Sequence, residues 1–192
     1  QKRTYFKQNV IFRAIDGRLG CPGKIWGLRV PWHARYTRKR KTRGLDTGKE
    51  RRIGMRDWSE WVGAATPGAP LVFLLAGEPE GLVAPLRAAL EPAVAQGTCP
   101  AFLLAGLSPV DWDRDYSPWP AQGSQGRAFA GEARALLPRV RETIARLQAR
   151  HALGEAIYPV GYSLGGLAAL YFHCEAGFSG CGSCSGSLWY PG

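Results

Sequence analysis

Lysine is absent from this sequence after position 49, and methionine occurs only once. The six lysines lie between Lys2 and Lys49, and the single methionine is Met55. Residues 1–54 hold 16 of the 25 Lys and Arg residues and 3 of the 15 acidic residues, so their formal charge is +13 and that of residues 55–192 is −3. We therefore expect two segments of different origin, a basic leader over 1–54 that is disordered or non-native, and a folded domain over 55–192.

Several other features are missing, and each absence excludes a class of protein. No apolar run is long enough to cross a bilayer, and neither possible start carries a secretory signal, so we expect a cytoplasmic protein without a membrane partner. The five cysteines include one pair with metal-ligand spacing, Cys181 and Cys184, but no second Cys/His pair completes a site. No phosphate-binding loop with its lysine is present. The sequence thus predicts reduced thiols and no metal or nucleotide cofactor.

The basic leader offers one functional alternative. Residues 35–43 form a run of arginines and lysines that would neutralise phosphates, and Trp32 and Tyr36 would be available to stack on bases. No recognised nucleic-acid-binding fold surrounds this run, and such runs are more often solvated tails. We expect no nucleic-acid partner.

From Pro70 onward, short apolar runs alternate with amphipathic stretches. The expected strands are 71–75, 101–105, 157–160 and 178–185. One expected helix carries Leu82 to Val94 on its apolar face and another carries Phe129 to Leu147, with Pro92 and Pro138 predicting a bend, an end or a late start. This order predicts an α/β fold with a mainly parallel sheet and helices on both faces.

The most informative motif is GYSLGG at 161–166, between an expected strand and an expected helix. A serine on a sharp strand-to-helix turn needs neighbours without side chains, which Gly161 and Gly165 provide. The backbone N–H of Leu164 would then point at an oxyanion formed when Ser163 attacks a carbonyl. With 25 glycines in the chain, an ordinary glycine turn is the alternative. The strand before the motif and the helix after it favour a nucleophile elbow.

Together with four further segments, the elbow resembles the α/β-hydrolase fold and, more narrowly, the bacterial esterase group that includes siderophore (enterochelin-type) esterases. These segments are residues 74–78, 114–120, 136–138 and 185–190. The resemblance implies a carboxylic-ester hydrolase that acts on a small-molecule ester through an acyl-Ser163 intermediate. It also implies that the second oxyanion-hole N–H comes from Gly77 or Glu78.

Residues 114–120 have two interpretations. In the functional one they form a wall of the substrate pocket, with Arg114 and Tyr116 as polar contacts and Trp119 as an apolar surface. In the structural one they form a loop in which Asp115 pairs with a nearby arginine. The sequence leaves both open.

The remaining triad residues do not follow the family pattern, in which an acid and then a histidine come after the serine. The chain offers only His173 and Glu175 there, and His173 lies about 15 Å along the helix at about 1.5 Å per residue. We therefore expect a C-terminally truncated α/β-hydrolase domain, inactive alone and with an exposed sheet edge. The alternatives are a non-catalytic binding domain and an acyltransferase on the same elbow.

Overall fold

A five-stranded sheet forms the centre of the molecule. The computed structural model describes residues 10–13, 25–28, 56–77, 81–108, 110–123 and 126–191. The strand order is β3-β5-β4-β8-β9, and all neighbours are parallel except β3 and β5. The strands are β3 Arg56–Val62, β4 Leu71–Leu75, β5 Phe102–Ser108, β8 Ile157–Tyr162 and β9 Gly182–Cys184. The predicted α/β class with a mainly parallel sheet is confirmed.

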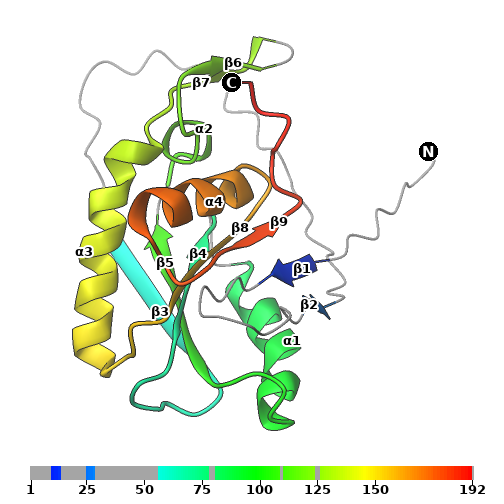
Figure 1. The fold of residues 1–192 in the computed structure, drawn as a ribbon, viewed down its shortest axis with the longest axis vertical. Helices are drawn as coiled ribbons and strands as arrows, with labels where there is room; N and C mark the ends of the chain where they lie inside the picture. Colours follow the sequence, from blue (N-terminus) through cyan, green and yellow to red (C-terminus); the bar gives the residue numbers. More distant parts are fainter. Residues whose placement is uncertain are drawn as a thin grey trace, which may run out of the picture.

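Helices cover both faces of this sheet (Figure 1). They are α1 Val83–Ala95, the short α2 Trp112–Asp115, α3 Ala133–His151 and α4 Leu164–Ala176. On one face, α3 and α4 pack against side chains of β4 and β5 such as Phe73 and Leu103. On the other face, α1 packs against Leu74 and Leu104. Alternate residues of the same strands therefore enter two separate cores, as buried parallel strands require.

Two small hairpins complete the described chain. Strands β6 Ala121–Gln122 and β7 Ala128–Phe129 pair between α2 and α3, and β1 Val10–Arg13 pairs with β2 Ile25–Leu28. Apart from β1 and β2, the predicted leader over 1–54 lies outside the described residues. The expectation that residues 1–54 are a disordered or non-native leader stays a prediction.

Some expected elements have different bounds. The strand β3 was not predicted, and it pairs antiparallel with β5 at one edge of the sheet. The helix expected from Phe129 begins at Ala133 and continues through Pro138, while Phe129 lies in β7 with its ring buried. The last strand is shorter than 178–185, because it comprises only Gly182–Cys184. Strand β9 is the other edge of the described sheet, and β1 lies next to it.

Candidate active site

Ser163 occupies the turn between β8 and α4. Its backbone has φ 53° and ψ −119°, a conformation that residues with a side chain rarely adopt. The register of the parallel strands aligns Leu75 with Gly161, so Ala76 and Gly77, which follow β4, lie beside the turn. The carboxyl ends of two central strands thus meet at the half-buried Ser163.

The glycines around Ser163 leave no room for side chains. A Cβ atom on Gly161 would overlap the backbone carbonyl of Gly165. A Cβ on Gly165 would lie 2.5 Å from the carbonyl oxygen of Leu75, and one on Gly166 would lie 2.9 Å from the Ser183 Oγ. The backbones of β8, α4 and β4 can therefore approach only because these positions are glycine.

Backbone hydrogen bonds hold the Ser163 peptide groups in place. Its N–H donates to the carbonyl of Cys184 at 3.0 Å, and its carbonyl accepts from the N–H groups of Gly166, Leu167 and Ser187 at 3.0 to 3.1 Å. Residue 164 is the first of α4, where backbone N–H groups have no acceptor within the helix. Such an N–H, at the positive end of the helix dipole, suits an oxyanion.

A second serine, which the sequence did not single out, meets the first. The Oγ atoms of Ser163 and Ser187 are 3.1 Å apart, and Ser187 is only 1% exposed. Ser187 belongs to the segment 185–190 on which the family resemblance partly depends. Its membership of that segment was the only indication in the sequence that Ser187 belongs to the site. Ser187 lies 24 positions after Ser163, so no local spacing pattern connects the two serines.

Trp112 is another site residue that sequence reasoning missed. A Cβ on Gly77 would lie 3.3 Å from one edge of its indole ring, and a Cβ on Gly165 would lie 3.5 Å from another atom of that ring. The indole therefore spans from the end of β4 to the first turn of α4. Gly77, one of the two predicted oxyanion-hole residues, lies beside the elbow, while Glu78 is outside the described residues.

Tyr116 lies behind the site instead of facing it. It is 1% exposed, and its hydroxyl donates a hydrogen bond to the carbonyl of Ala76 at 3.1 Å. Burial, followed by the charge of Asp115, raises the pKa of Tyr116 well above its usual range. The phenol thus stays protonated and holds the end of β4 from the core side.

Arg114 is engaged in ion pairs within its own loop. Its guanidinium Nε lies 2.7 Å from an oxygen of the buried Asp115 and 3.4 Å from one of Glu132. The hydrogen bond to Asp115 is the main reason that the pKa of Arg114 is raised. The structural interpretation of residues 114–120 predicted this pairing.

Trp119 is partly exposed and is hydrogen-bonded to Tyr190 and Pro191. Its indole N–H donates to the carbonyl of Pro191 at 2.5 Å, and its own carbonyl accepts from the Tyr190 hydroxyl at 2.6 Å. The two rings pack edge to face with centroids 5.6 Å apart. Trp119 is 40% exposed, so part of its side chain remains open to solvent.

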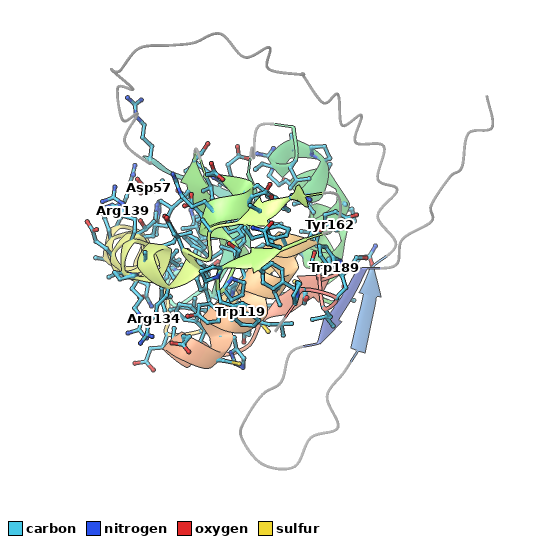
Figure 2. The ribbon with its side chains drawn as sticks, turned by 90° about the horizontal axis from the view of Figure 1, so that it is seen from above. Asp57, Trp119, Arg134, Arg139, Tyr162 and Trp189 are labelled. Atoms are coloured by element: carbon cyan, nitrogen blue, oxygen red, sulfur yellow. The ribbon has the colours of Figure 1, made fainter. Side chains whose placement is uncertain are left out.

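Other large apolar side chains are exposed next to the two serines. Tyr162 precedes Ser163 and is 42% exposed, while Leu188 and Trp189 follow Ser187 and are 71% and 62% exposed. Figure 2 shows Tyr162 and Trp189 close together in projection, with Trp119 nearer the middle of the view. Exposed apolar surface around a polar group is typical of ligand-binding surfaces.

No His, Asp or Glu side chain among the described residues is hydrogen-bonded to the Ser163 hydroxyl, whose partner there is Ser187. His151 ends α3 and packs edge to face against Trp61, and His173 lies in the last turn of α4. Within the part of the chain that the structure describes, no group of His, Cys, Asp and Glu could hold a metal ion. In the same residues, no helix is both long and apolar enough to span a membrane.

No protein-family model matches the sequence, and no curated protein matches it. Solved structures do match. The enterobactin esterase FES from Shigella flexneri, solved in the presence of enterobactin, aligns over 72% of this chain with a TM-score of 0.56 and 22% identity. The siderophore hydrolase EstA from Aspergillus nidulans aligns over 71% of this chain with a TM-score of 0.57 and 16% identity.

The chain has the fold of these esterases. It spans 35% of the Shigella enzyme and 58% of the Aspergillus enzyme, so it corresponds to part of each. The BES protein from Bacillus cereus aligns over 77% of this chain and 67% of its own, with a TM-score of 0.53 and 14% identity. The predicted esterase-like α/β-hydrolase fold, incomplete relative to these neighbours, is confirmed.

Proposed function

We propose that Ser163 is the nucleophile of a carboxylic-ester hydrolase that works through an acyl-serine intermediate. The conformation of Ser163 is the observation that carries this proposal. A non-glycine residue at φ 53° between tightly packed glycines costs stability, and such strain is concentrated at functional sites. An ordinary glycine turn would place a glycine, not a serine, at the position with positive φ.

In this mechanism the Ser163 Oγ attacks the carbonyl carbon of the ester, and the carbonyl electrons move onto its oxygen. The N–H of Leu164 and one N–H near Gly77 or Glu78 stabilise that oxyanion. The hydroxyl proton passes to an imidazole, which later protonates the leaving alcohol. Since no described imidazole is hydrogen-bonded to Ser163, we propose that the histidine and its acid come from outside the described residues and that turnover depends on them.

The surroundings of Ser163 favour an ester with an aromatic or apolar group. Tyr162 precedes Ser163, and Leu188 and Trp189 follow its partner Ser187. We propose that these side chains and the exposed part of Trp119, which packs on Tyr190, contact the substrate. The Arg114 side chain is paired with Asp115 and Glu132 and is 45% exposed, so the N–H groups outside these pairs are the ones we propose for the substrate. Tyr116 contributes by holding the end of β4 and not by binding the substrate.

The test is hydrolysis of aryl and short-chain alkyl esters by the native protein that carries this chain. We expect Ser163→Ala to lower kcat for ester hydrolysis by about a thousandfold or more, as nucleophile replacements do in other serine hydrolases. Ser185→Ala is a matched control, because Ser185 is exposed and also has a positive φ. Hydrolysis that survives Ser163→Ala would contradict the proposal.

A further inference from the structure

Ser187 contacts the proposed nucleophile at two points. Its N–H donates to the carbonyl of Ser163 at 3.0 Å, and its Oγ lies 3.1 Å from the Ser163 Oγ. The side chain is 1% exposed, and Ser163 is the hydrogen-bond partner of its hydroxyl among the described residues. The backbone hydrogen bond therefore fixes the separation of the two segments, and the Ser187 hydroxyl has one hydrogen-bond partner among the described residues, the Ser163 Oγ.

The segment that carries Ser187 is itself held on both sides. The carbonyl of Ser187 accepts from the N–H of Tyr190 at 3.0 Å, and the Tyr190 hydroxyl donates to the carbonyl of Trp119. On the other side, a Cβ on Gly186 would overlap the Ser183 Oγ, so the chain packs closely there. Ser187 is thus held in place independently of its hydroxyl.

We propose that Ser187 is a positioning residue for Ser163, which fixes the direction of the Ser163 Oγ and donates a hydrogen bond to it when that atom loses its proton. This inference rests on the proposed function of Ser163. A hydroxyl both donates and accepts, whereas a deprotonated nucleophile only accepts. The Ser187 Oγ lies 3.1 Å from the Ser163 Oγ, and toward a negatively charged oxygen its O–H can only donate. Hydrogen bonds to a charged acceptor are stronger than those between neutral groups.

The charge state can be measured directly after Ser163→Cys, because a thiol titrates in an accessible range. The alkylation rate of the introduced thiol by iodoacetamide, followed against pH by peptide mass spectrometry, gives its pKa in the full chain. We expect Ser187→Ala in that background to raise this pKa by about 1, and to lower the thiolate fraction about tenfold at a fixed pH below it.

Three further variants separate the hydroxyl from the fold. Ser185→Ala lies in the same segment, is exposed and should leave the pKa of the introduced thiol unchanged. Ser187→Gly also removes the hydroxyl and should match Ser187→Ala, which provides a second test if one of them fails to fold. Ser187→Thr retains the hydroxyl and should keep the pKa near that of the Ser163→Cys background.

An equal pKa with and without the Ser187 hydroxyl would overturn the inference. This readout needs no hydrolysis, so it is distinct from failure of the proposed function, which would be ester hydrolysis that does not depend on Ser163. In the native protein, the same role predicts that Ser187→Ala lowers kcat about tenfold and leaves KM unchanged. A change in KM alone would also overturn the inference.

Discussion

Gly161 and Gly165 face each other across the turn so closely that a methyl group on Gly161 would overlap the carbonyl of Gly165. The atoms that this methyl group would meet all belong to the backbone of Gly165 and Gly166, so no flexible side chain can move aside. The turn that exposes Ser163 thus depends on the absence of one methyl group at each position.

Gly161→Ala is expected to lower the free energy of unfolding by about 3 kcal/mol, because forcing extra atoms into tightly packed backbone strains the whole turn. Urea denaturation followed by far-UV circular dichroism measures this change. The matched control is Gly81→Ala, since a Cβ there has no atom within 4 Å. Equal stability of the two variants would show that the turn is looser than described.

The strain at Ser163 gives a second prediction. With φ at 53°, glycine fits this position better than any residue with a Cβ. Ser163→Gly should therefore have a free energy of unfolding about 1 kcal/mol higher than Ser163→Ala. Both variants lose the hydroxyl and its bond to Ser187, so their difference isolates the backbone term. If Ser163→Ala is as stable as Ser163→Gly in urea denaturation, the backbone is not strained.

These two predictions concern the part of the site that could be predicted from the sequence. The elbow is local, so six consecutive residues specify the glycines, the serine and the first helical N–H. The apolar runs at 71–75 and 157–160 likewise predicted β4 and the core of β8, since buried parallel strands are continuously hydrophobic.

The rest of the fold and site depends on contacts between distant residues. Strand β3 carries charged side chains at positions such as Arg56 and Glu60 and has only Val62 fully buried, so no apolar run marks it. Ser187 and Trp112 reach the elbow from segments 24 and 51 positions away from Ser163, and only the folded sheet brings them there.

The buried phenol behind the site provides a third prediction. Tyr116→Phe removes the hydrogen bond to the carbonyl of Ala76 and leaves that acceptor in the core. We expect the free energy of unfolding to fall by about 1 kcal/mol. Tyr158→Phe serves as the control, because Tyr158 is only half-buried and its hydroxyl has no hydrogen bond among the described residues. A larger loss in the Tyr158 variant would contradict this role of Tyr116.

The thiol of Cys184 predicts how stability depends on alkaline pH. Burial raises the pKa of Cys184 from the ordinary 9.0 to about 11. The folded chain therefore binds this proton more tightly than the unfolded chain, so the contribution is fully present below pH 9.0 and is lost as the pH rises toward about 11.

Urea denaturation at several pH values in this window measures that loss. Cys184→Ala should show a shallower fall in stability between pH 9.0 and about 11 than the unmodified chain does. The partly buried thiols of Cys99 and Cys181 and the buried phenols of Tyr116 and Tyr190 are present in both proteins, so the difference belongs to Cys184. Identical slopes would mean that this thiol is not buried as described.

The most direct test of the central claim is to identify the residue that a fluorophosphonate labels in the native protein that carries this chain. Peptide mass spectrometry should find the adduct on the peptide that contains Ser163, and Ser163→Ala should remove it without loss of folding. Labelling confined to another residue, or esterase activity with Ser163 unlabelled, would contradict the assignment of Ser163 as the nucleophile.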